Sequence, residues 1–423
     1  MAGEVLPNGC ILDLVRPRGS DVLGLIVWNK VKTAIAGQFE YEDKTYVPVE
    51  MDPSFQAAML FPTRATSVTA PTCELFGDLM WVIRDYLDLP GPALSQIVFF
   101  IYGTWLADCL PIAPFLSIVS PARADGMLLL QLLALLCRRP LLLTADGSAD
   151  LWSLPIHLRP TLLLHGTGLT PQIRRFLLAS HAQGILTPRK GKALDLYCAK
   201  AFCSPEPLSD RVLANSALEI TLHPRRRQLT PLTPSESQRI SERFQADLLR
   251  YRLSKFHSIQ PPNLDLQGLT VQAQGLASSL AACIVDDEEI QSEIVPLLKG
   301  QERESQVDRS VELESVVLEA LLLNCHNGKG STLRAAELAE TANTILARRG
   351  ESLQLSPESV GWKLKSLGLR TEPIGSTGNG LWLLTETRTK IHDLALEHGM
   401  PPDNQGLSDG CPDCARLNEG ARP

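Results

Sequence analysis

Residues Leu116 to Leu136, LSIVSPARADGMLLLQLLALL, carry the most informative pattern for the fold of this chain. It predicts an apolar strand, a short loop of small residues and an apolar helix. Such a loop can bind phosphate through its backbone amides and the positive end of the helix dipole. A second apolar strand, PTLLLHG at 160–166, ends abruptly. In phosphate-binding proteins, a strand placed there usually carries acidic residues that hold magnesium and orient water.

The surrounding sequence extends this pattern in both directions. Between Ile112 and Leu222, short apolar runs alternate with helical segments, which predicts an α/β layer with a mostly parallel sheet. Residues 75–87 and 96–110 have helical spacing. From Val22 to Val49 the apolar and polar residues alternate as in strands. We therefore expect a small β-unit before the α/β core.

The C-terminal part from Val311 to His398 has its own pattern. It predicts three helices and then a hairpin around the Gly/Ser/Asn turn GSTGNG. Ser356 is a suitable N-cap for the third helix and Gly368 a suitable stop. This is the order of a winged helix.

The sequence thus predicts five parts, with residues 72–110 as a helical lead-in to the second. They are a small β-rich unit (1–52), a P-loop-type α/β domain (72–260), a helical linker or lid (264–308), a winged-helix domain (310–399) and a mobile tail (400–423).

The segment TWLADCLPIAPFLSIVSPARADG (104–126) resembles the entry to the P-loop in AAA+/helicase-like ATPases of phage, plasmid and integrated-element origin. The resemblance covers Leu75 to His398 in order and is weakest before residue 75. It implies a mostly parallel P-loop sheet, followed by a second helix and often a C-terminal winged helix.

This chain departs from that family at the residues that perform the chemistry. Met127 and Leu128 stand where relatives place Lys and Thr, and His165 and Gly166 where they place Asp and Glu. Ser216 stands near a family Arg position, although Arg211 is close by. The missing groups stabilise the phosphates, the magnesium ion and the attacking water. We therefore expect no nucleotide hydrolysis.

Two interpretations of the loop stay open. The backbone amides from Arg123 to Gly126 retain some ability to bind phosphate or ATP with magnesium, or the segment is a plain strand–turn–helix that needs no ligand. The vestigial nucleotide-binding residues are Ser120, Arg123, Gly126, Met127, His165 and Gly166.

Basic residues indicate DNA as a partner, because phosphate contacts depend on Lys and Arg. The candidate DNA-binding residues are Arg225, Arg226, Arg227, Ser359, Lys363, Lys365 and Arg370. In the third helix of the winged block, Val360, Leu364 and Leu367 should face inward. Alternatively, the basic cluster is a solvated helix face, and the winged block docks a protein.

Cysteines suggest one metal site. Cys411 and Cys414 form a C-x-x-C that follows His392 and His398, and two Cys with two His suit tetrahedral zinc. The alternative is two free thiols in a mobile tail. Cys198 and Cys203 have a spacing untypical of metal sites and should be buried thiols.

Composition limits the other classes of function. The chain has 423 residues, a formal net charge of −7 and ten Cys. Its longest apolar run, Met127–Cys137, is too short to span a membrane, and no secretory signal is visible. We expect a cytoplasmic protein with reduced thiols and no membrane partner, whose nucleic-acid binding would need a local basic patch.

The favoured function is a catalytically degenerate P-loop ATPase-like protein with a DNA-binding winged helix. It would serve replication, maintenance or regulation of a mobile genetic element. Its expected partners are DNA and an active ATPase or replication subunit, and the chain is expected to form homo-oligomers. One alternative is a protein-interaction scaffold without DNA binding. Another is an ATPase or helicase that retains activity through a non-standard site.

Overall fold

The computed structural model describes residues 3–121, 123–145, 151–189, 191–208, 210–223, 231–311, 313–326, 331–348, 353–374, 378–398, 400, 411 and 413–414. The chain divides into two compact units, Met1–Lys299 and Gly300–Pro423, and each is described by itself.

The first unit is built around a five-stranded sheet. Its strands, all parallel, are β7 (Phe115–Val119), β8 (Pro140–Thr144), β9 (Thr161–His165), β12 (Lys200–Ser204) and β13 (Leu218–Thr221). Their spatial order is β13-β7-β12-β9-β8. This confirms the predicted α/β core with a parallel sheet. The sequence analysis did not identify β12, which lies between the two strands singled out there.

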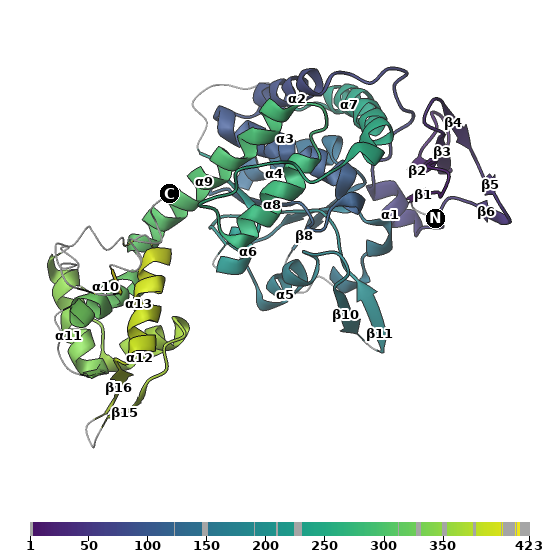
Figure 1. The fold of residues 1–423 in the computed structure, drawn as a ribbon. Coiled ribbons are helices and arrows are strands. Elements are labelled where there is room, and N and C mark those ends of the chain that lie inside the picture. The colour runs from purple at the N-terminus through teal and green to yellow at the C-terminus, as the bar shows by residue number, and fades with distance from the viewer. Residues whose placement is uncertain are drawn as a thin grey trace. The chain divides into compact units, whose positions relative to one another are not determined.

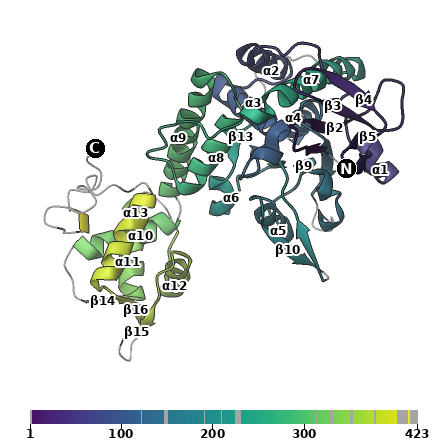
Figure 2. The same cartoon turned by 45° about the vertical axis from the view of Figure 1, so that its right-hand side comes forward.

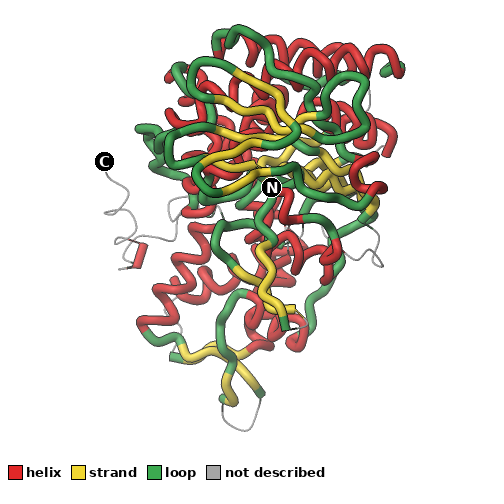
Figure 3. The backbone as a smooth tube through the Cα atoms, turned by 90° about the vertical axis from the view of Figure 1, so that its right-hand side faces the viewer, coloured by secondary structure: helices red, strands yellow, loops and turns green. Residues whose placement is uncertain are grey.

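Helices cover both faces of this sheet, so its strands are apolar on both sides. Leu116 and Ile118 of β7 face the helices α3 (Gly91–Leu106) and α4 (Arg123–Leu136). Phe115 faces the opposite way, into the core that contains α5 (Pro171–Ala179). In Figures 1 and 2, α3 and α4 lie on one side of the sheet and α5 on the other. Figure 3 shows the same unit with its strands in yellow and its helices in red.

The other elements of this unit extend the core. An antiparallel sheet contains β1 (Gly3–Val5), β2 (Ile11–Val15), β3 (Gly24–Trp28) and β4 (Thr33–Ala36). Two hairpins are β5 (Phe39–Tyr41) with β6 (Lys44–Tyr46), and β10 (Leu186–Arg189) with β11 (Lys192–Asp195). The helices are α1 (Pro53–Ala58), α2 (Thr72–Tyr86), α6 (Arg211–Asn215), α7 (Pro234–Lys255), α8 (Val271–Ala282) and the first half of α9 (Glu288–Val311), which crosses the boundary at Lys299.

A buried ionic cluster joins the N-terminal strands to the α/β core. Asp13 of β2 accepts hydrogen bonds from Arg138 (2.9 Å), Arg139 and Arg252 (2.8 Å). Arg252 also donates to Asp108 at 2.6 Å. Burial alone would raise the pKa of Asp13, but the three guanidinium groups outweigh it and hold that pKa well below its usual range. Asp13 therefore stays charged and fixes β2 against α7 and the end of α4.

A second buried charge, Lys200, has no carboxylate in hydrogen-bonding contact among the described residues. It begins β12, is fully buried, and its Nζ donates to the carbonyl oxygen of Ser180 at 2.9 Å. Burial lowers the pKa of Lys200 from 10.5 to about 8. This pKa is lower in the folded chain than in the unfolded chain, so burial of the charged amine reduces the free energy of unfolding at neutral pH. The free energy of unfolding rises between pH 8 and 10.5, because there the folded chain has lost this proton and the unfolded chain still binds it.

We therefore expect Lys200→Met to stabilise the protein at pH 7. The pKa lowering corresponds to about 3 kcal/mol, and the lost hydrogen bond leaves a net gain of about 1–2 kcal/mol. Urea denaturation at pH 7 and pH 10 measures it, and the gain should shrink at the higher pH. Lys192→Met, at an exposed position of β11, is the control and should change little. A Lys200→Met protein that is less stable at pH 7 would show that the buried charge carries no net penalty.

Beyond the end of α9, the described residues of the second unit form helices and a three-stranded antiparallel sheet. The helices are α10 (Leu313–His326), α11 (Ala335–Arg348), α12 (Pro357–Ser366) and α13 (Thr385–Glu397), and the sheet β14-β16-β15 is formed by Thr332–Arg334, Asn379–Trp382 and Glu372–Pro373. The three helices and the hairpin expected from the sequence are present, whereas β14 and α13 were not predicted.

The third helix of this unit, α12, follows its sequence signals closely. Ser356 caps it by accepting a hydrogen bond from the Ser359 amide at 3.2 Å. Gly368, with φ of 71°, ends it in the left-handed region that favours glycine. Val360, Leu364 and Leu367 are buried, as predicted. These three residues therefore form the buried face of α12, and the opposite face of the helix is exposed to solvent.

Within the described part of the chain, none of the helices combines the length and apolar character that crossing a membrane requires.

Candidate functional site

The loop between β7 and α4 is closed by its own packing. Helix α4 already begins at Arg123, so Gly126 lies inside its first turn. The N–H of Gly126 donates to Oγ of Ser120 at 3.0 Å. A Cβ at Gly126 would lie 2.5 Å from Sγ of Cys203 and 2.8 Å from Cβ of Ser120. The space above the end of β7 is therefore filled by side chains of β12 and of the loop.

The charges at this helix start also disfavour an anion. Asp125, which the sequence analysis passed over, lies in the first turn of α4 and is only 9% exposed. A carboxylate in that turn interacts with the helix dipole as a phosphate would, and repels a second anion. Met127 is half-buried and uncharged, and the side chain of Arg123 lies outside the described residues.

The carboxyl end of β9 offers no metal ligand of the expected kind. His165 is half-buried, and Gly166 is buried with its N–H donating to the Cys203 carbonyl oxygen at 2.9 Å. A Cβ at Gly166 would lie 3.0 Å from the ring of Phe202. An acidic side chain at this position would therefore require the Phe202 ring to move. Cys198 and Cys203 are both buried, as expected of apolar thiols.

The predicted DNA-binding residues of the second unit fall into two groups. Lys363 forms an ion pair with Glu314 of α10 at 3.2 Å, and Oγ of Ser359 donates to the Ser356 carbonyl oxygen at 2.8 Å. Both side chains are thus engaged within the unit. Lys365 and Arg370 are exposed.

The exposed pair lines a groove on this unit. The groove has a volume of about 780 Å³ and lies between the start of α11, the outer face of α12 and the β15–β16 hairpin. Arg334 contributes a third basic side chain from the end of β14, and Trp362 is 71% exposed on α12. Glu358 and Glu372 are its acidic members. Sequence reasoning did not select Arg334 or Trp362, although the exposure of Trp362 follows from the helical spacing of Val360 and Leu364.

Arg225, Arg226 and Arg227 were also predicted to bind DNA. They belong to residues 224–230, which lie outside the described residues.

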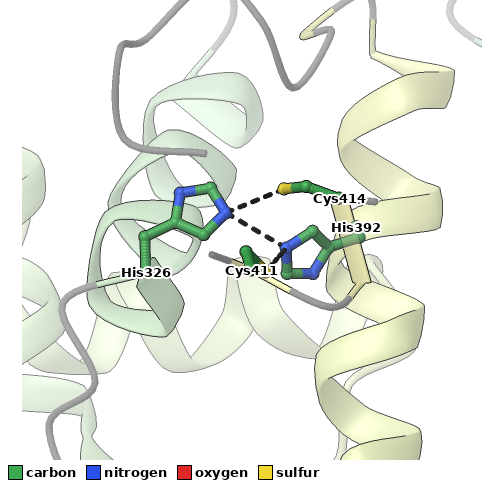
Figure 4. Close-up of side chains that lie close together, drawn as sticks. All are labelled: His326, His392, Cys411 and Cys414. Atoms are coloured by element: carbon green, nitrogen blue, oxygen red, sulfur yellow. Dashed lines mark hydrogen bonds between the residues drawn. The ribbon is translucent and has the colours of Figure 1, made fainter. Parts of the chain in front are cut away.

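A group of metal-ligating side chains lies elsewhere on the second unit. His326, His392, Cys411 and Cys414 place one ligand atom each within 4.8 Å of one another (Figure 4). The expectation that His398 joins this group was wrong, because His398 is buried with its Nδ1 3.5 Å from Oγ of Ser315. His326, from the end of α10, takes its place. Its distance in sequence from the other three residues gave no local signal.

The fold and these sites define the chain as a mixed α/β protein whose five-stranded parallel sheet is consistent with a P-loop-like core. No family model and no curated protein matches the chain. Among solved structures it is similar to the C-terminal region of NrS-1, with 11% identity, a TM-score of 0.40, and coverage of 88% of this chain and 96% of that one.

Two further solved structures share weaker similarity. Cdc6p from Pyrobaculum aerophilum has 12% identity and a TM-score of 0.19, and covers 73% of this chain and 95% of its own. Drosophila ORC bound to DNA has the same identity and TM-score, with 84% and 95% covered. Because these TM-scores are low, the assignment of function depends on the residues of this chain.

Proposed function

We propose that this protein is a P-loop-type scaffold that does not hydrolyse nucleotide and that binds DNA through its C-terminal unit. Its work in replication, maintenance or regulation of a mobile element follows from the resemblance of its core segment to phage and plasmid helicase-like ATPases. The observation that carries the DNA-binding part is the groove in which Arg334, Lys365 and Arg370 surround the exposed Trp362.

The absence of hydrolysis is supported by geometry as well as by residue identity. Hydrolysis needs a cation and a hydroxyl at the loop and carboxylates at the neighbouring strand. Met127 and Leu128 supply neither of the first two, and His165 and Gly166 supply no carboxylate. The close packing of Gly126 against Ser120 and Cys203 also leaves the loop without a phosphate cradle.

DNA binding is supported by the order of elements in the second unit. The order helix, strand, two helices and hairpin supports the proposal of a winged helix, in which α12 would enter a groove of DNA and the β15–β16 hairpin would be the wing. In this proposal Lys365 and Arg370 would contact phosphates, and Trp362 would make an apolar contact with a base or sugar; all three line the groove. The net charge of −7 makes this local basic surface the relevant one.

Fluorescence anisotropy with labelled duplex DNA at several salt concentrations tests this proposal. The wild-type protein should bind more weakly as salt rises, because phosphate contacts release counterions. Lys365→Ala with Arg370→Ala should weaken binding and reduce the log–log salt slope by about 2, since each duplex contact contributes about 0.9. Arg348→Ala, at the exposed far end of α11, is the matched control and should leave the slope unchanged.

The same DNA titration in the presence of ATP and magnesium, together with a hydrolysis assay, tests the proposal that the P-loop-type core does not hydrolyse nucleotide. We expect unchanged DNA affinity and hydrolysis at background level. Absence of binding at low salt would instead favour the protein-docking function for the C-terminal unit. Hydrolysis above background by the purified protein would show a non-standard ATPase site.

A further inference from the structure

The strongest chemistry outside the proposed DNA face is the group of two His and two Cys on the C-terminal unit. Its members come from three separate segments. His326 is the last residue of α10, His392 lies in α13, and Cys411 and Cys414 belong to the C-terminal segment (Figure 4). The donor atoms of three separate segments thus lie close together.

Three of the six distances between the ligand atoms are close to the edges of a tetrahedral site, and all six are at most 4.8 Å. Nε2 of His326 lies 3.1 Å from Nε2 of His392 and 3.1 Å from Sγ of Cys414, and Sγ of Cys411 lies 3.4 Å from Nε2 of His392. Bond lengths of about 2.0–2.1 Å to nitrogen and about 2.3 Å to sulfur give ligand–ligand edges of about 3.3–3.8 Å. The four atoms, all within 4.8 Å of one another, therefore lie close enough to surround one zinc ion once their side chains adjust.

The surroundings orient the ligands for a metal. Nδ1 of His392 lies 2.7 Å from the Arg388 carbonyl oxygen and can donate a hydrogen bond to it. This contact places the proton on Nδ1 and leaves the lone pair of Nε2 directed into the group, as in most zinc-bound histidines. Oγ1 of Thr389 donates to Asp413 at 3.1 Å and holds the segment between the two cysteines against α13.

Two of the four side chains are buried, unlike the ligands of a cluster that forms by chance on a protein surface. His392 is 3% exposed and Cys414 is 1% exposed. His326 and Cys411 are half-buried. Two thiols and two imidazoles that converge in this partly buried place leave several lone pairs facing one another, and a divalent cation satisfies all of them at once. All four positions are filled by protein atoms, which is typical of a structural zinc site and not of a catalytic one.

We propose that His326, His392, Cys411 and Cys414 bind one structural Zn²⁺ ion. The ion fastens the C-terminal segment to α10 and α13, and so stabilises the unit that carries the DNA-binding groove. The site does not depend on the proposed DNA binding, because its residues lie outside the groove and zinc is measured directly.

Elemental analysis of the purified full-length protein tests the proposal. The chain is purified under reducing conditions without chelator, and we expect about one zinc per chain. His326→Ala and Cys414→Ser should each reduce the zinc content at least about five-fold. Cys73→Ser changes an exposed cysteine of the first unit and should keep the full content.

Alkylation of the wild-type protein provides a measurement that does not rely on folding of the variants. Zinc should protect Cys411 and Cys414 from iodoacetamide, and a strong chelator should expose both, as read by mass spectrometry. Cys73 should be labelled in both states and serves as the internal control. Titration of the metal-free protein with Co²⁺ should also produce the visible absorption of tetrahedral thiolate coordination.

Protein that contains less than about one tenth of a zinc per chain, and that gives no such absorption with Co²⁺, would overturn the site. Equal labelling of Cys411 and Cys414 with and without the chelator would overturn it as well.

Discussion

Asp13→Asn is expected to destabilise the N-terminal unit by about 3–5 kcal/mol. The substitution keeps the shape of the side chain but removes the negative charge that Arg138, Arg139 and Arg252 share in the interior. Removing one partner from a buried ionic cluster leaves the others desolvated and uncompensated, which costs far more than an exposed ion pair is worth. Urea denaturation at pH 7, followed by circular dichroism, measures the loss.

Asp43→Asn, in an exposed turn, is the control for this substitution and should change stability by less than about 0.5 kcal/mol. The difference between the wild type and Asp13→Asn should also depend on pH. The pKa of Asp13 is lower in the folded state than its ordinary 3.8, so its contribution is complete above about pH 4 and is lost in stronger acid. A loss below about 1 kcal/mol at pH 7 would contradict the role given to this cluster.

Gly126→Ala is expected to destabilise the protein by a net amount of about 1–2 kcal/mol. The new Cβ would lie 2.5 Å from Sγ of Cys203 and 2.8 Å from Cβ of Ser120, closer than real Cβ atoms approach. Both neighbours are buried, so the strain of overpacking has no easy relief. It outweighs the gain in helix propensity, which is about 1 kcal/mol for Gly→Ala. Urea denaturation measures the net change.

Two variants make this prediction specific. Gly77→Ala, inside α2 with nothing within 4 Å of the added atom, should instead stabilise the protein by about 1 kcal/mol. Cys203→Ala combined with Gly126→Ala should recover part of the loss, because it removes the closest contact. Equal behaviour of the Gly126 and Gly77 variants would show that the space at the end of β7 is open, and would reopen the case for a phosphate there.

The packing of Gly126 also bears on how activity is tested. A variant at Gly126 changes the stability of the core, so a loss of any activity in that variant would not separate nucleotide binding from folding. Direct assays on the wild-type protein with ATP and magnesium avoid this ambiguity.

Elements with local signals could be predicted from the amino-acid sequence. Apolar runs predicted β7 and β9 within an α/β layer, and periodicity with caps predicted α12 with Val360 and Leu364 inward. The missing Lys, Thr and acidic residues around Gly126 and Gly166 were also visible from the sequence. Such features depend on the types of neighbouring residues and on the short spacing between them, both of which can be read from the sequence.

Contacts between residues that are distant in sequence became known from the three-dimensional fold. It placed β12 between β7 and β9 despite a buried lysine in its first position, and it packed Cys203 against Gly126. It also paired Lys363 with Glu314 and brought His326, which is 66 residues before His392, to the metal-ligating group in place of His398. These outcomes follow from how helices and strands pack in space, and no spacing along a single segment encodes them.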